Sequence, residues 1–132
     1  MKLGHTDSTI NALYTCSNTN PQKVTVTSGG TTSVSFYNKL NTGSISLTKT
    51  TEDGQNLSGW QFGIYSNSAC TTLVSGPHTT NTSGKISVTG LTPGTYYVKE
   101  LGHTDSAINA LYYCSSTNPQ AVTVTAGATA TV

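Results

Sequence analysis

Charged residues are scarce in this chain: Asp, Glu, Lys and Arg make up 8% of its 132 residues, and the formal net charge is +1. Proteins that bind nucleic acids or anionic membranes gather Lys and Arg into basic clusters, which this sequence lacks. It also has no apolar stretch that approaches the length of a membrane span. We therefore expect neither nucleic acid nor a membrane among its partners.

Apolar residues are also few, at 34%, but they alternate with polar residues in short runs. A period of two is typical of strands with one buried face and one face in water. Turn residues separate these runs, and residues 103–113 offer one helical turn at most. The sequence thus predicts an all-β sandwich. Its expected strands comprise residues 23–28, 33–38, 44–49, 60–66, 85–90, 95–100 and 121–126.

The chain contains an internal repeat. Residues 3–34 return at residues 101–132, an offset of 98 positions, with 24 of the 32 aligned residues identical. A period of this length suits a small domain in a tandem array. We interpret residues 1–38 as the C-terminal part of a preceding repeat and residues 39–43 as a linker. Residues 44–132 are then a repeat domain that lacks the end of its last strand, because residues 35–38 have no counterpart after Val132.

Each repeat contains two cysteines, because Cys16 and Cys114 occupy the same position in the two copies of the repeat. One pair per domain fits a disulfide in an exported protein. We predict a Cys70–Cys114 bond, which would close a long loop and add about 3–4 kcal/mol of stability; free thiols are the alternative. No C-x-x-C or clustered Cys/His spacing occurs, so we expect no metal site, and we expect no cofactor.

Three segments together carry a longer pattern: SISLTKTTEDGQNLSGWQFGIYS at 44–66, TNTSGKISVTGLTPGTYYVKE at 80–100, and VTVTSGGTTSVSFYN at 24–38. This pattern resembles the B-type repeats of collagen adhesin and the SpaA-like pilin domains, which are surface modules of Gram-positive bacteria. The resemblance covers essentially the whole chain. It implies a prealbumin-like or inverse immunoglobulin-like β-sandwich whose first and last strands lie side by side and parallel.

The resemblance also implies a site. Many members of this family form a spontaneous isopeptide bond between a Lys on the first strand and an Asn or Asp on the last, assisted by a Glu on a central strand. Matched position by position, Lys49 is the nucleophile, Glu100 the acid and Asn38 the acceptor. Trp60 is a departure, because the family more often has a small residue there, and it is expected to alter the packing near the bond.

The chemistry fits these residue types. Burial among apolar side chains favours the neutral form of an amine, which is the form that attacks an amide. Burial likewise favours a protonated carboxylic acid, which can donate a hydrogen bond to the amide carbonyl while ammonia leaves. Strand alternation places Lys49, Glu100 and Asn38 on the apolar faces of their strands. Each residue taken singly also fits a solvated strand end.

We therefore expect a structural module of an adhesin or pilus-like fibre at the bacterial cell surface, although the first ten residues lack the apolar core of a secretory signal. The chain is not expected to be an enzyme, beyond one autocatalytic turnover on itself. Its expected partners are other copies of the same repeat, joined head to tail when Asn38 of one molecule adds a strand beside Lys49 of the next. The alternative is an adhesin module that binds a host protein or glycan without a covalent crosslink.

Overall fold

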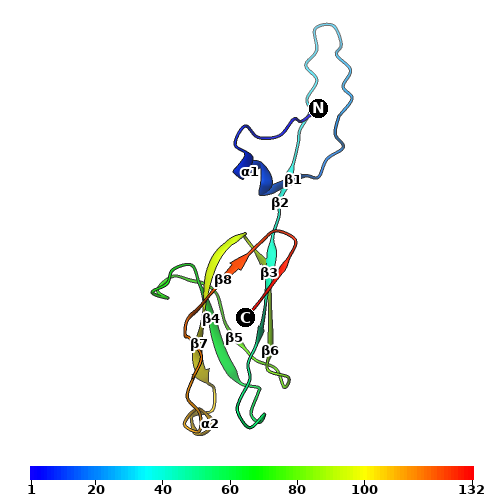
Figure 1. Ribbon diagram of the computed structural model, residues 1–132. Helices are drawn as coiled ribbons and strands as arrows, with labels where there is room; N and C mark the ends of the chain where they lie inside the picture. The colour runs from blue at the N-terminus through cyan, green and yellow to red at the C-terminus, as the bar shows by residue number, and fades with distance from the viewer. The chain divides into compact units, whose positions relative to one another are not determined.

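The computed structural model describes residues 1–132, and the chain divides into two compact units, Met1–Asn41 and Thr42–Val132. The second unit is a β-sandwich (Figure 1). A three-stranded sheet in the order β6-β3-β9 packs against a four-stranded sheet in the order β5-β4-β7-β8. The elements are β3 (Gly43–Thr48), β4 (Trp60–Tyr65), β5 (Leu73–Thr79), β6 (Lys85–Leu91), β7 (Gly94–His103), α2 (Ser106–Asn109), β8 (Gln120–Val124) and β9 (Thr129–Thr131).

The core lies between these two sheets and follows the expected period of two. In β3, Ile45 and Leu47 are buried, while the serines beside them are partly exposed. Because alternate side chains of a strand point to opposite faces, β3, β4, β7 and β8 contribute every second residue to the core, whereas β5 contributes none. The core consists of Ile45, Leu47, Trp60, Phe62, Ile64, Ile86, Val88, Leu91, Tyr96, Val98, Val122 and Val124. The prediction of an all-β, prealbumin-like sandwich is confirmed.

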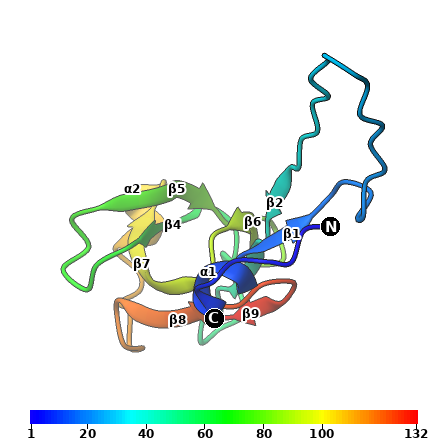
Figure 2. The same ribbon diagram turned by 90° about the horizontal axis from the view of Figure 1, so that it is seen from above.

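The first and last strands of the sandwich run parallel. Ser44 lies opposite Thr129 and Ser46 opposite Thr131, so β9 forms one edge of its sheet. The pairing continues past β9, because the Val132 carbonyl accepts a hydrogen bond from the Thr48 N–H at 3.0 Å. Figure 2 shows β8 in orange and β9 in red, consecutive strands that belong to different sheets.

The first unit contains α1 (Ser8–Ala12), β1 (Tyr14–Cys16) and β2 (Asn38–Leu40). The two strands form an antiparallel ladder in which Cys16 lies opposite Asn38. None of the side chains in Met1–Asn41 is buried. This unit therefore has no core of its own, and its hydrogen bonds define its fold.

Five of the expected strands are present in the second unit, and the helical turn is present as α2. The strands expected at 23–28 and 33–38 are wrong: only Asn38 of those residues lies in a strand. In the second copy, the counterparts of residues 22–26 form β8 and those of residues 31–33 form β9, because β7 and β3 lie beside them; the first unit has no such partners. The sequence also failed to predict β5, whose Pro77 argues against a strand; β5 is an edge strand, where proline is tolerated.

Residues 39–43, expected as a linker, contribute the end of β2 and the start of β3. Neither helix is long and apolar enough to span a membrane.

Candidate functional site

Lys49 and Glu100 form an ion pair at one end of the sandwich. Lys49 follows the last residue of β3 and continues the face that carries Ile45 and Leu47, while Glu100 lies on β7 opposite Phe62 of β4. The Lys49 Nζ donates to the Glu100 Oε2 at 2.9 Å, and the two side chains are only 13% and 12% exposed. A hydrogen bond of this kind, largely shielded from water, provides a direct path for a proton between amine and carboxylate.

The Trp60 side chain lies against the Lys49 amine. The Lys49 Nζ lies 4.3 Å from the centroid of the Trp60 ring, within the range of a cation–π interaction. Trp60 opens β4 and is 2% exposed. The departure from the family pattern thus places an aromatic face against the candidate nucleophile.

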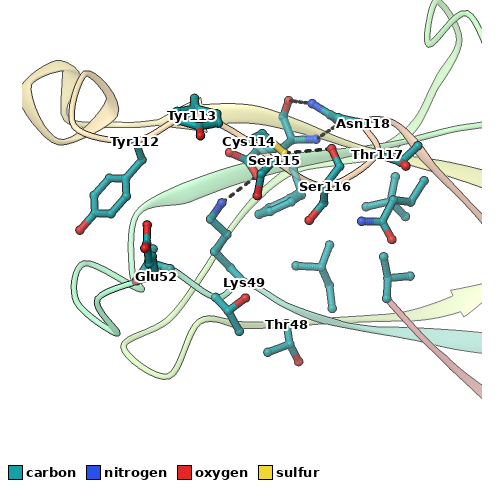
Figure 3. Close-up of a pocket in the computed structure, with 18 of the residues that line it drawn as sticks. Thr48, Lys49, Glu52, Tyr112, Tyr113, Cys114, Ser115, Ser116, Thr117 and Asn118 are labelled. Carbon is teal, nitrogen blue, oxygen red and sulfur yellow. Dashed lines mark hydrogen bonds and ion pairs between the residues drawn. The ribbon is translucent and has the colours of Figure 1, made fainter.

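The pair borders a pocket of about 460 Å³ within the second unit. Figure 3 shows Lys49 extending across this pocket toward the chain segment that carries Cys114 and Ser115. Its lining combines apolar side chains, among them Leu47, Phe62 and Val132, with many hydroxyl-bearing residues. The hydroxyl-bearing residues are Thr48, Thr50, Thr51, Tyr112, Tyr113, Ser115, Ser116 and Thr117.

Asn118 fixes the backbone at Glu100. Its Oδ1 accepts from the Glu100 N–H at 2.9 Å, and its Nδ2 donates to the Glu100 carbonyl at 3.2 Å (Figure 3). The Asn118 side chain thus takes the place of a strand partner where the β7–β8 ladder ends at Val98 and Gln120. Glu100 is therefore held in strand geometry, with its carboxylate directed at Lys49.

Trp60 is itself fixed by three hydrogen bonds and two aromatic contacts. Its backbone N–H donates to the Thr80 Oγ1 at 3.0 Å, its carbonyl accepts from the Thr80 N–H, and its indole N–H donates to the Asn56 carbonyl at 2.7 Å. His103 and Tyr112 contact the indole edge to face, at centroid distances of 5.0 and 5.8 Å. The wall beside Lys49 is therefore rigid.

Asp53 links the turn before β4 to this aromatic cluster. The Gln55 backbone N–H and the Tyr112 hydroxyl both donate to its carboxylate. These hydrogen bonds, the Gln55 one foremost, lower the pKa of Asp53 below its ordinary value of 3.8. The exposed carboxylate thus acts as an acceptor that ties the turn to Tyr112.

Asn38, the expected acceptor, lies in the other unit. It begins β2 opposite Cys16, and its side chain is exposed. The structure therefore brings the expected nucleophile and acid together within the sandwich and leaves the expected acceptor accessible for another partner.

The structure contains no Cys70–Cys114 disulfide: all three cysteines are free thiols. This corrects the sequence prediction, and strand direction explains the difference. Cys70 lies in the loop after Tyr65, at the end of β4 that pairs with Tyr97. Cys114 lies in the connection after β7, which leaves the sheet at its opposite end, and it lines the pocket beside Lys49.

Sequence reasoning missed Asn118, Thr80 and Tyr112 as supports of the site. Their contributions depend on contacts between residues 18 to 59 positions apart. One available signal was the recurrence of Thr-Asn-Pro-Gln in both copies of the repeat, because a turn sequence that is repeated without change suggests a fixed local structure.

The SpaA prealbumin-like fold domain matches residues 43–132 of this chain. Among solved structures, the chain is similar to the minor pilin GBS52 of the Gram-positive pathogen Streptococcus agalactiae, with 27% identity and a TM-score of 0.54 over 74% of this chain and 45% of that one. It is also similar to the TIE protein of Bacillus anthracis, with 26% identity and a TM-score of 0.52 over 74% of this chain and 16% of that one. The chain therefore spans less than half the length of either. No curated protein matches it.

Proposed function

This chain belongs to the family of SpaA prealbumin-like domains, and from that membership we propose that it is a structural module of a fibre or adhesin on a Gram-positive cell surface. Families with this pilin-like fold are structural rather than enzymatic. In such a role the sandwich transmits tension along a chain of subunits, and other copies of the same module are its partners.

We further propose that Lys49 forms an isopeptide bond with an asparagine. The observation that carries this proposal is the Lys49–Glu100 pair, an amine and a carboxylic acid held 2.9 Å apart against the core. When an acceptor strand covers the pocket and excludes water, the proton of the ammonium passes to Glu100. The neutral amine then attacks the carboxamide, whose carbonyl oxygen accepts a hydrogen bond from the Glu100 carboxyl group.

The atoms of this reaction balance without any co-reactant. One N–C bond forms between Lys49 Nζ and the acceptor carbonyl carbon, the bond from that carbon to its amide nitrogen breaks, and one ammonia leaves. Glu100 carries the proton between the entering and the leaving nitrogen. Fixed geometry supplies much of the rate, because all the reacting groups then belong to one folded site.

The proposed acceptor is Asn38 of a second molecule. Val34 is the repeat counterpart of Val132, which pairs beside β3. A strand that continued β9 in the same register would place Phe36 opposite Lys49, with Asn38 two residues further along the same face. The parallel β3–β9 pairing supports this arrangement, and repetition of the contact gives head-to-tail chains.

Mass spectrometry of the intact protein tests the bond. We expect a product that lacks one ammonia per crosslink, and a ladder on reducing, denaturing electrophoresis. Lys49→Ala should abolish both, whereas Lys85→Ala should abolish neither, because the amine of Lys85 contacts Thr48 on the solvent side of β3. A monomer of unchanged mass, or a ladder that survives Lys49→Ala, contradicts the proposal.

A further inference from the structure

The two copies of the repeat have nearly the same sequence but opposite environments. We call residues 3–38 the first arm and residues 101–132 the second arm. In the second arm, Val122 and Val124 are core residues with exposed fractions of 9% and 1%. Their counterparts in the first arm, Val24 and Val26, are 48% and 78% exposed. The first arm therefore carries the same apolar residues that the second arm packs into the core, but in the first arm they are exposed.

The first arm already has the local structure that the second arm uses on the sandwich. Asp7 caps α1 as Asp105 caps α2, in each case by accepting from two backbone N–H groups. Asn20 holds the backbone of Lys2 by the same pair of hydrogen bonds through which Asn118 holds Glu100. The first arm is thus preformed at its N-terminal end and open between Cys16 and Asn38, where Figure 1 shows an extended loop without strands.

A pocket in the first arm corresponds to the place that Trp60 fills on the second. This pocket, of about 170 Å³, is lined by residues that include Gly4, His5, Ile10, Asn11 and Tyr14. In the second arm, the counterparts of His5 and Tyr14 are His103 and Tyr112, the two residues whose rings contact the Trp60 indole. The first arm therefore presents the same aromatic cradle without an indole in it.

We propose that the first arm of one molecule replaces the second arm on the sandwich of another copy, with Trp60 of that copy seated in the pocket of the first arm. Residues 22–26 and 31–33 of the first arm then take the positions of β8 and β9. The exchange point lies between Glu100 and Leu101, so Lys49 and Glu100 remain with their own sandwich.

The exchanged form gains contacts that the second arm does not provide. The first arm continues through residues 35–38, so Phe36, which is 38% exposed, can cover the apolar wall of the Lys49 pocket. Burying that ring and the valines is favourable. The exchange gives up the β1–β2 ladder, whose strands are three residues long, and a few hydrogen bonds beside it, such as those from Ser17 to Tyr37 and from Gln22 to Ser35. Because the two arms are nearly identical, replacing one with the other otherwise changes the free energy of folding little.

This inference deepens the proposed head-to-tail assembly and rests on it for the choice of partner, but it does not require the covalent bond. It is therefore tested in the full chain with Lys49→Ala, which cannot form that bond. The second arm must leave before the first can replace it, so the protein is unfolded in denaturant and refolded at high concentration. Sedimentation velocity then measures the fraction of dimers and longer chains.

Two further substitutions in that background separate arm exchange from other association. Val26 and Thr25 are both exposed in the first arm, but their counterparts differ: Val124 is buried and Thr123 is exposed. Val26→Asp should weaken self-association by more than about a hundredfold, because a carboxylate would enter the core. Thr25→Asp should leave it unchanged. Monomers at every concentration, or equal effects of the two substitutions, overturn the inference.

The same measurements distinguish this inference from the proposed bond. Association without a covalent ladder in the chain that retains Lys49 refutes the isopeptide and leaves the arm exchange standing. A ladder that is indifferent to Val26→Asp refutes the exchange and leaves the bond, formed when residues 35–38 alone add beside β3.

Discussion

The Lys49 ammonium and the Trp60 indole face each other at 4.3 Å, between the end of β3 and the start of β4. The same nitrogen lies 2.9 Å from the Glu100 carboxylate, so a cation–π contact and an ion pair together fix the position of the amine.

We predict a measurable coupling between Lys49 and Trp60. Lys49→Met removes the charge and keeps an apolar stem, while Trp60→Phe weakens the aromatic face and removes the indole N–H. Each change should destabilise the fold, and a double-mutant cycle by urea denaturation should give a coupling of about 0.5–2 kcal/mol. Strictly additive effects would show that the cation–π contact contributes nothing to stability.

Glu100→Gln should lower both stability and reactivity. The amide cannot balance the ammonium of Lys49 or take its proton, so a largely shielded charge loses its partner at a cost of about 1–3 kcal/mol. Crosslinking, followed as the loss of ammonia by mass spectrometry, should stop. Glu52→Gln is the matched control, because Glu52 lines the same pocket but is exposed. Equal effects of the two substitutions would remove Glu100 from the mechanism.

Most of the sandwich could be predicted from alternation, which located β3, β4, β6, β7 and β8 and missed the edge strand β5. The strands expected at 23–28 and 33–38 show the limit of that reasoning. Residues 24–27 are identical to residues 122–125, yet only the second copy forms a strand, β8, beside β7. Strand formation here depends on the neighbour that supplies hydrogen bonds and a core, which local sequence does not encode.

The candidate site divides in the same way. Strand alternation places Lys49 and Glu100 on inward faces, and the family pattern identifies them as candidate site residues. The contact with Trp60 and the backbone clamp of Asn118 depend on how two sheets and a long connection meet. The prediction of a Cys70–Cys114 disulfide was wrong for the same reason. It paired the cysteines by their number per repeat and did not consider that they lie at opposite ends of the sheet.

The stability of the chain should show a specific acid dependence from Asp53. Its pKa is lowered by the Gln55 N–H and the Tyr112 hydroxyl, so its stabilising effect is present above the ordinary value of 3.8 and is lost as pH falls through the lower folded value. The Tm difference between the natural chain and Asp53→Asn should be constant near neutral pH and should shrink in acid. Tyr112→Phe should reduce this pH dependence in part. A difference that does not change with pH would contradict this assignment.

Thr80 is the buried polar residue on which the Trp60 wall depends. Its side chain, in a residue that is 4% exposed, accepts from the Trp60 N–H at 3.0 Å and donates to the Leu57 carbonyl at 2.7 Å. Thr80→Val keeps the shape and leaves both backbone groups without this partner, so we expect a loss of about 2–4 kcal/mol in the free energy of unfolding. Thr80→Ser keeps the hydroxyl and loses one methyl group, at a cost of about 1 kcal/mol.

The relative stabilities of Thr80→Val and Thr80→Ser distinguish the contribution of the hydroxyl from that of the methyl group. If packing of the methyl group were the main contribution, serine would be the worse replacement and valine nearly neutral. If the hydroxyl bridge fixes the start of β4, valine is worse, and its effect extends to the site: the fluorescence of the single Trp60 should shift to the red as the indole gains contact with water. Unfolding in urea, monitored by that fluorescence, measures both quantities in one experiment. A Thr80→Val chain as stable as the natural one would show that Trp60 is held by its aromatic neighbours alone.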